Sequence, residues 1–239
     1  MDDVDSIRRY YGAILPYYDD ALADRGDLPF WGSMASRWGS GRILELGCGT
    51  GRVTEVLCRY APVTAMDLLI EMLLRASPRA PAARLIAADL RRFALRAPFD
   101  LIVLADDPMA HLTSMTDRAR VLRLIADHLM PHGRVVLEGL YRHHGTVPHP
   151  PAQDMAALTV EEWWTPTSEA SVWKAGYRFR QGTSTVEVQS VMRSWSLAEL
   201  DHLPEAGLEI ESVWGDFDES PFSDGSPRMI IVAKRTSHR

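Results

Sequence analysis

The sequence predicts a doubly wound α/β fold, and two observations lead to this prediction. Between residues 42 and 138, short apolar runs alternate with segments whose apolar residues recur at helical spacing. Strands that alternate with helices pair in parallel through right-handed crossovers. A glycine-rich turn also follows the first apolar run, where an open α/β sheet binds its ligand. We therefore expect one sheet covered by helices, with a site at the carboxyl ends of its strands.

Each expected element follows from a local pattern. Residues 1–40 are expected to be helical, with a break at Pro16 and a second helix from Leu28 to Trp38. Seven strands are expected at residues 42–46, 62–66, 84–88, 99–104, 134–138, 208–214 and 228–233. Further helices are expected at 51–60, 70–76, 116–129 and 197–206, with Pro131–Gly133 ending the third. Ser196 and Glu199 form a capping box that opens the last helix.

Residues 145–195 have a different texture and are expected to form an antiparallel insertion. Three segments, 156–164, 171–180 and 183–195, are rich in β-branched and aromatic residues. Gln181-Gly182 lies between the last two segments and predicts a hairpin turn.

Composition narrows the class of protein. The chain has 239 residues, 46% of them hydrophobic and 24% charged, which is typical of a globular domain. Its formal net charge is −6, and no basic run is present, with Arg91 and Arg92 read as solvated charges; nucleic acid is not an expected partner. No apolar run approaches the ~20 residues of a membrane helix, so no membrane partner is expected. No secretory signal is visible and the two cysteines indicate no disulfide framework, so we expect a cytoplasmic protein.

The glycine-rich turn, Gly47-Cys48-Gly49-Thr50-Gly51, limits the ligand. No lysine follows it, which excludes a P-loop. Its G-x-G-x-G spacing is one residue shorter than the dinucleotide fingerprint, which disfavours a dehydrogenase. The positive end of the following helix favours a negative group, either a phosphate or a carboxylate.

Two acidic residues stand at the ends of the next two strands. Asp67 can accept hydrogen bonds from both ribose hydroxyls, and Asp89 can read the exocyclic amine of adenine. Both lie at the edge that carries the glycine turn, so an adenosine-bearing cofactor is expected. The alternative is that Asp67 only caps the next helix and that Asp89 is only a loop residue.

Five motifs in order now resemble those of the class I S-adenosylmethionine-dependent methyltransferases. They are ELGCGTG at 45–51, DLxxEML at 67–73, ADL at 88–90, PFDLIV at 98–103 and LMPHGRVV at 129–136. The resemblance covers roughly residues 28–140, and the tail at 196–218 is similar to that of small-molecule N- and O-methyltransferases. It implies a Rossmann-like, seven-stranded mixed sheet built from residues 41–144 and 196–239. It also implies an N-terminal helical lid (1–40), and the insertion (145–195) is expected to cover the acceptor pocket.

The resemblance also implies S-adenosylmethionine as cofactor and a role for each matched position. The cofactor-binding residues would be Tyr18, Glu45, Gly47, Cys48, Gly49, Gly51, Asp67, Leu68, Met72, Asp89, Leu90 and Ala105. Of these, the glycine turn would line the methionine moiety, the Ala105 carbonyl would face its amino group, and Glu45 would orient the turn. Met72 could equally be a core residue.

The acceptor is expected beside residues 105–112, directly after the fourth strand. Asp106-Asp107 stands where relatives often have an amide, and the absence of N-P-P-Y counts against nucleobase and glutamine amines as acceptors. His111 is the first candidate for a catalytic base, and Asp107 is the second. His111 could equally be a supporting residue bonded to backbone.

Aromatic residues crowd the lid and the insertion. Tyr11, Trp31, Trp164 and Tyr177 are the candidates for substrate binding, although each could instead fill a core. His143, His144 and His149 lack the second ligand pair of common zinc motifs, so no metal is expected.

The predicted function is methyl transfer to oxygen, nitrogen or an electron-rich carbon of a small-molecule acceptor, such as a specialised metabolite. A homodimer is a possible assembly. Two alternatives remain: a protein that binds S-adenosylmethionine on the same fold without transferring methyl groups, and a protein or RNA methyltransferase. The second would need a basic strip beside the pocket, which the sequence does not show.

Overall fold

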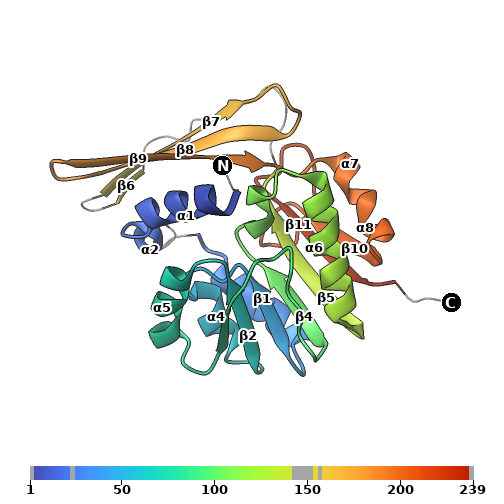
Figure 1. The fold of residues 1–239 in the computed structure, drawn as a ribbon. Coiled ribbons are helices and arrows are strands. Elements are labelled where there is room, and N and C mark those ends of the chain that lie inside the picture. Colours follow the sequence, from blue (N-terminus) through green and yellow to red (C-terminus); the bar gives the residue numbers. More distant parts are fainter. Residues whose placement is uncertain (1–2, 22–24, 142–152, 156–157, 237–239) are drawn as a thin grey trace.

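Seven strands form the central sheet of the computed structural model, which describes residues 3–21, 25–141, 153–155 and 158–236. The strands are β1 (Ile43–Leu46), β2 (Val63–Asp67), β3 (Arg84–Ala87), β4 (Phe99–Leu104), β5 (Leu129–Gly139), β10 (Leu208–Trp214) and β11 (Met229–Arg235). Their spatial order is β10-β11-β5-β4-β1-β2-β3 (Figure 1). The first five strands pair in parallel, whereas β11 is antiparallel to both β5 and β10. The expected mixed sheet is confirmed.

The chain reverses its direction of progress across the sheet at β1. Ile43 pairs with Val63 of β2 on one side and with Leu101 of β4 on the other. The connections after β1 and β4 therefore leave the sheet in opposite directions. A crevice opens at such a point, outside the carboxyl ends of the strands, and open α/β sheets bind ligands there.

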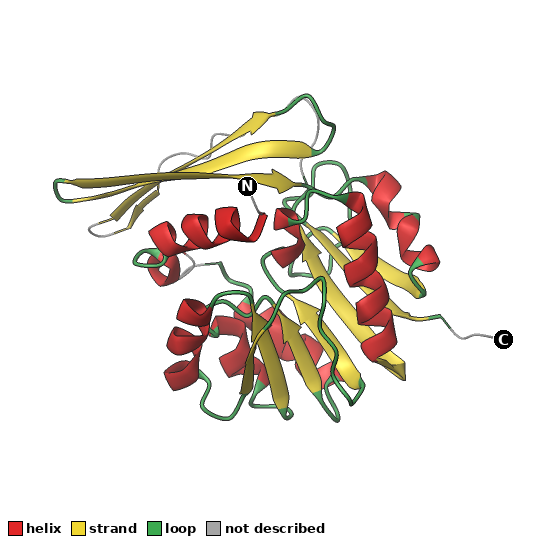
Figure 2. Ribbon diagram, in the orientation of Figure 1, coloured by secondary structure: helices red, strands yellow, loops and turns green. Residues whose placement is uncertain are grey.

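Helices cover both faces of the central sheet (Figure 2). They are α3 (Leu28–Trp38), α4 (Arg52–Leu57), α5 (Ile70–Arg79), α6 (Met115–His128), α7 (Leu197–Leu200) and α8 (His202–Glu205). Leu44 and Ile102 belong to the core that includes side chains of α6, while Ile43 and Leu101 belong to the core that includes α3 and α4. Neighbouring strand residues thus face opposite cores, which is why these strands read as continuous apolar runs. None of the described helices is long and apolar enough to cross a membrane.

A second sheet lies above the N-terminal helix α1 (Asp3–Ile14), which lies between part of this sheet and the central domain (Figure 1). Its strands are β6 (Gln153–Met155), β7 (Leu158–Pro166), β8 (Val172–Gln181) and β9 (Ser184–Arg193), all antiparallel to their neighbours. Tyr10 and Ile14 of α1 share a buried cluster with Trp164, Trp173 and Phe179 of this sheet. Burial of this apolar surface fixes α1 beneath the insertion.

Four details differ from the sequence-based expectation. The helix expected at 197–206 is divided at Asp201, because Pro204 has no N–H to donate to the Leu200 carbonyl. Helix α6 ends at His128, and β5 begins at once and includes Pro131–Gly133, with a register shift against β4. The hairpin turn lies one residue later, at residues 182–183, and the insertion gains the short strand β6.

The capping box is confirmed, because the Ser196 backbone N–H donates to the Glu199 carboxylate at 2.7 Å.

Candidate active site

The glycine turn is held by Asp67 at the end of β2. Gly47, Gly49 and Gly51 all have positive φ values (77°, 53° and 82°), a conformation that side chains other than glycine rarely adopt. The Gly49 N–H donates to Asp67 Oδ2 at 2.8 Å, and the Leu69 N–H donates to Asp67 Oδ1 at 2.9 Å. Each carboxylate oxygen keeps further lone pairs that a ribose hydroxyl could use.

A cavity with an empty volume of about 660 Å³ opens beside this turn. The residues that line it are Ile7, Tyr11, Tyr18, Gly47, Gly49, Asp67, Leu68, Leu69, Met72, Asp89, Leu90, Arg91, Pro108, His111 and Leu112. The structure therefore brings together the candidates from the ends of β2, β3 and β4 and from the N-terminal segment.

Several expected cofactor residues lie behind this wall. Glu45 is buried and accepts a hydrogen bond from Thr54 Oγ1 at 2.5 Å. This bond joins the end of β1 to α4, the helix that follows the glycine turn. Gly51 begins α4, where a Cβ would meet Ala76 at 2.9 Å. Cys48 and Ala105 are buried in the core on the α3 side, and burial raises the pKa of the Cys48 thiol. The Cys48 thiol is therefore protonated and unreactive.

Asp107, the second candidate for a catalytic base, does not line the cavity. Its Oδ2 accepts the Leu140 N–H at 2.7 Å, so the side chain ties the loop after β4 to the end of β5. Burial raises the pKa of Asp107 to about 7. Asp106 and Asp107 have φ values of 58° and 43°, so this loop is strained at two consecutive residues.

The aromatic candidates for substrate binding also differ in whether they line the cavity. Tyr11 lines the cavity, whereas Trp31, Trp164 and Tyr177 do not. Trp31 has 0% exposure, and its indole N–H donates to Asp27 Oδ2 at 3.1 Å within the core on the α3 side. Trp164 is buried between α1 and the second sheet, and Tyr177 packs against the same cluster. Their large apolar surfaces serve these cores rather than the cavity.

His111 reaches the cavity from a short 3₁₀ helix, η1 (Pro108–His111). Its Nε2 lies 2.8 Å from the Tyr11 hydroxyl. Its Nδ1 is buried and has no hydrogen-bond partner among the described residues. Burial lowers the pKa of His111 to about 4, so the ring is neutral at physiological pH. A neutral imidazole offers one donor and one acceptor nitrogen to its surroundings.

Arg91 belongs to the site although its sequence was read as a solvated charge. Its Nη2 lies 2.7 Å from Asp89 Oδ2, and its Nε lies 3.0 Å from Asp89 Oδ1. Although burial raises the pKa of Asp89, the hydrogen bonds from Arg91 lower it on balance. The spacing of two residues between this acid and this base was the available signal. Ile7, Leu69, Pro108 and Leu112 gave no comparable signal, because apolar residues fill cores and cavity walls alike.

Arg25 is a second residue that sequence reasoning missed. It forms ion pairs with Asp106 and, at 2.5 Å, with Glu138 of β5, and it lies 3.6 Å from Asp27. Glu138 also accepts the Asp106 N–H at 2.7 Å. Carboxylates from the ends of β4 and β5 are thus joined to the N-terminal segment.

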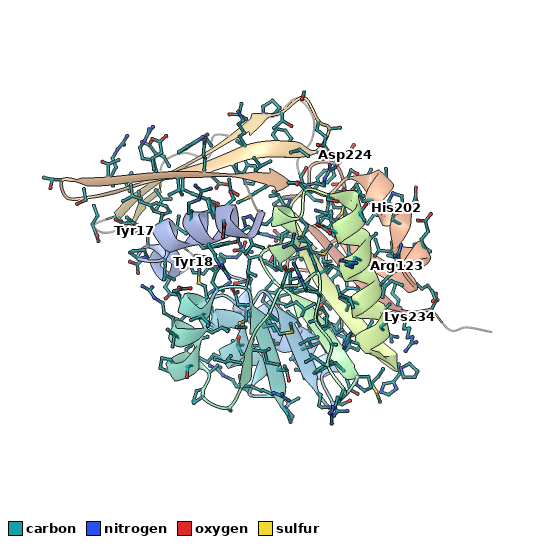
Figure 3. All side chains as sticks on the ribbon, viewed as in Figure 1. Tyr17, Tyr18, Arg123, His202, Asp224 and Lys234 are labelled. Carbon is teal, nitrogen blue, oxygen red and sulfur yellow. The ribbon has the colours of Figure 1, made fainter. Side chains whose placement is uncertain are left out.

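The N-terminal segment is also tied to the glycine turn. Thr50 Oγ1 donates to Asp19 Oδ1 at 2.5 Å, and Arg79 of α5 lies 2.9 Å from the same oxygen. The Tyr18 ring covers Gly49, where a Cβ would lie 3.1 Å from the Tyr18 hydroxyl oxygen. Figure 3 shows Tyr18 on the side of the central domain, while Tyr17 stacks on Phe179 of the second sheet. The N-terminal segment therefore lies over the glycine turn, where a lid is expected.

The donors and acceptors around the cavity fit S-adenosylmethionine. Asp67 offers acceptors to a ribose, and Asp89 offers acceptors to an amine of the base. Tyr11 and Tyr18 present aromatic surface, which suits a sulfonium. No cluster of metal-ligand side chains occurs within the described ranges, and the candidate metal residues His143, His144 and His149 lie outside them.

The fold and this cavity are similar to those of the class I S-adenosylmethionine-dependent methyltransferases. Residues 43–133 match the model of the methyltransferase domain family, so the chain carries a domain of that family and its cofactor is S-adenosylmethionine.

Three known proteins illustrate the similarity. The dTDP-4-amino-2,3,4,6-tetradeoxy-D-glucose N,N-dimethyltransferase of Saccharopolyspora spinosa is 35% identical over 97 residues, 40% of this chain and 39% of that protein. The cypemycin N-terminal methyltransferase of a Streptomyces species is 24% identical over 211 residues, 81% of this chain and 82% of that protein. CalS10, an amino pentose methyltransferase from Micromonospora echinaspora, superposes with a TM-score of 0.75 at 25% identity, over 92% of this chain and 97% of that one. The matched segments span only 39% to 53% of three curated amino-sugar N,N-dimethyltransferases.

Proposed function

We propose that the protein transfers a methyl group from S-adenosylmethionine to the nitrogen of a small-molecule amine. One observation carries this proposal: the neutral imidazole of His111, bonded to Tyr11, lies in the wall of the cavity that also contains the glycine turn and Asp67. The similar proteins support nitrogen as the acceptor atom, because three of them are N,N-dimethyltransferases of dTDP-linked amino sugars and one is an N-terminal methyltransferase.

The charge around the cavity favours the same chemistry. Burial raises the pKa of the Tyr11 hydroxyl, and the carboxylates of Asp106, Asp67 and Asp107 raise it further. These carboxylates therefore contribute a negative potential around Tyr11, which the pairing of Asp106 with Arg25 and of Asp107 with Arg118 reduces. Such a potential stabilises a sulfonium and also the ammonium that forms when an amine gains a methyl group.

The reaction is an in-line displacement. When bound, S-adenosylmethionine supplies an electrophilic methyl group on a sulfonium. The amine lone pair forms the new N–C bond, the C–S bond breaks, and its electron pair returns to sulfur. The product nitrogen then loses a proton to water or to a base. Much of the rate enhancement can come from positioning alone.

His111 is suited to orient the amine. In the tautomer that carries its proton on Nε2, the ring donates to the Tyr11 hydroxyl and leaves Nδ1 as a free acceptor. Once the ring turns to expose this buried nitrogen to the cavity, a hydrogen bond from an amine N–H to it would fix the direction of the amine lone pair. Because its pKa is about 4, His111 accepts a proton only transiently and passes it on.

The first experiment is calorimetric titration of the wild-type protein and of Asp67→Ala with S-adenosylmethionine and with NADH. Binding of S-adenosylmethionine alone, lost in the variant, is the expected result. Failure of folded wild-type protein to bind it would overturn the proposal.

The second experiment is transfer from methyl-labelled S-adenosylmethionine to a panel of acceptors. The panel contains nucleotide-linked amino sugars, free amino sugars, peptides with a free N-terminus, and matched alcohols and carboxylic acids. Label on amines and not on the matched alcohols or acids is expected. Cofactor binding without transfer to any acceptor would favour the non-methylating alternative. The cytoplasmic location and the homodimer remain predictions of the sequence.

A further inference from the structure

A buried arginine stands behind the short helix that carries His111. Arg118 of α6 has 1% exposure, and its Nε lies 3.0 Å from Glu199 Oε1. Its Nη1 donates to the Met109 carbonyl of η1 at 3.3 Å and to the Arg193 carbonyl at the end of β9 at 3.4 Å. Its guanidinium carbon also lies 4.4 Å from the centre of the Trp195 ring. One side chain thus joins α6, α7, β9 and η1.

Of the two carbonyls that Arg118 contacts, the Met109 carbonyl belongs to the same short helix as His111. It also accepts the Leu112 N–H at 2.9 Å, and this bond closes the turn in which His111 lies. Arg118 therefore holds the same oxygen that closes this turn. Planar, multiply bonded guanidinium groups suit such fixed geometry better than a flexible ammonium.

The loop before η1 needs this support because it is strained. Asp106 and Asp107 both have positive φ values, and such conformations persist only where the surroundings over-determine them. The Asp106 N–H donates to Glu138, and Asp107 accepts the Leu140 N–H. These two contacts hold the start of the loop. Arg118 donates to the Met109 carbonyl, in the helix that follows the loop.

Arg118 also balances buried charge. Its cation faces the carboxylates of Asp107 and Glu199, while nearby Arg193 opposes it. Burial raises the pKa of Asp107, and the charge of Arg118 acts against this rise. Removing a buried cation leaves its partner carboxylates uncompensated, which disturbs the elements that carry them.

We propose that Arg118 is a positioning residue that fixes η1, and through it holds the His111 ring against Tyr11 in the cavity wall. Arg118 does not line this cavity itself, so it touches neither cofactor nor acceptor. The importance of this role rests on the proposed function of His111, whereas the contacts of Arg118 stand independently of it.

The test follows the His111 ring directly by NMR of histidine-labelled protein between pH 5 and 8. The chain has eight histidines, and the His111 signal is identified by its loss in His111→Gln. In the wild type, His111 is expected to stay neutral throughout this range. In Arg118→Met, η1 loosens, the ring reaches water, and His111 is expected to titrate within the range. Arg120→Met, on the exposed face of the same helix, is the matched control and should behave as wild type.

A loss of stability in Arg118→Met with an unchanged His111 would overturn the proposal, because it would leave Arg118 a merely structural role. Arg118→Lys keeps the charge and gives a second test if the methionine variant fails to fold. A lysine ammonium cannot hold both carbonyls and the Glu199 carboxylate together as the guanidinium does, so an intermediate His111 titration is expected, and a wild-type titration would count against the proposal.

Titration with S-adenosylmethionine separates this inference from the proposed function. Arg118→Met should still bind the cofactor, because the hydrogen bonds of Asp67 with Gly49 and Leu69 do not involve Arg118. If wild-type protein fails to bind S-adenosylmethionine, the proposed function falls, while the His111 titration still decides the role of Arg118.

Discussion

The Tyr11 hydroxyl and His111 Nε2 lie 2.8 Å apart, although 100 residues separate them in the sequence. This hydrogen bond joins the N-terminal helix α1 to the loop after β4. It therefore links the position of α1 to the orientation of the imidazole. Because Tyr11 and His111 both line the cavity, this part of the cavity wall is complete only when α1 is in place.

Tyr11→Phe is expected to lower methyl transfer about fivefold to tenfold, since one hydrogen bond contributes about 1 kcal/mol. The affinity for S-adenosylmethionine should change little, because the aromatic ring remains. The measurement is the rate of label transfer to the acceptor that the panel identifies. Tyr17→Phe is the control, because Tyr17 stacks on Phe179 at 4.8 Å, away from His111. Equal rates in Tyr11→Phe and wild type would show that the bond to His111 has no catalytic role.

Arg91 is expected to keep Asp89 ionised and correctly oriented for adenine. In Arg91→Met, the pKa of Asp89 should rise, because the hydrogen bonds that lower it are lost while burial remains. Weaker binding of S-adenosylmethionine is expected, with the larger loss at pH 5 and a smaller one at pH 8. Calorimetry at both pH values measures this difference. A loss of the same size at both pH values would mean that Arg91 contacts the cofactor directly.

Arg92→Met is the matched control for this experiment. The Arg92 side chain is 77% exposed and lies 3.9 Å from Asp89, so its removal should change affinity little.

Arg79 is expected to keep the lid closed, because it bonds both Asp19 and Thr50. In Arg79→Met, trypsin should cleave the N-terminal segment several-fold faster, since local opening governs such cleavage. Added S-adenosylmethionine should slow this cleavage if the cofactor is covered by the lid. Arg59→Met, on an exposed part of the chain, provides the comparison. Identical cleavage patterns for the two variants would remove Arg79 from this role.

Most strands and helices could be predicted from local sequence patterns, whereas much of the site depends on packing between distant segments. The strands at 99–104 and 208–214 were predicted to the residue, because the first is a nearly continuous apolar run and the second begins with alternating apolar and polar residues. The glycine turn and Asp67 were placed because each stands at the carboxyl end of a predicted strand, β1 for the turn and β2 for Asp67. The bonds of Asp107 to Leu140 and of Tyr11 to His111 depend on distant segments meeting, which no local pattern encodes. Trp31 and Trp164 were assigned to the acceptor because an aromatic residue suits a core and a pocket equally well by sequence.

Glu45 gives the protein a stability that falls as pH rises. Burial raises the pKa of Glu45 to about 8, above its ordinary value of 4.5, while its bond from Thr54 opposes the shift. Between these values the folded state holds a proton that the unfolded state has lost, so the free energy of unfolding decreases with pH across this window, by up to about 1.4 kcal/mol per unit. The stabilisation is complete below pH 4.5 and is lost above pH 8.

Glu45→Gln keeps a hydrogen-bond acceptor for Thr54 but removes the titration. Its free energy of unfolding should therefore decline less steeply than that of the wild type between pH 5 and 8, so that the variant gains relative stability towards pH 8. Urea unfolding at intervals across this range measures the difference between the two proteins. Asp107 and His111 titrate in both proteins, so their contributions cancel in this difference. A constant difference from pH 5 to 8 would show that Glu45 does not change its protonation in this window.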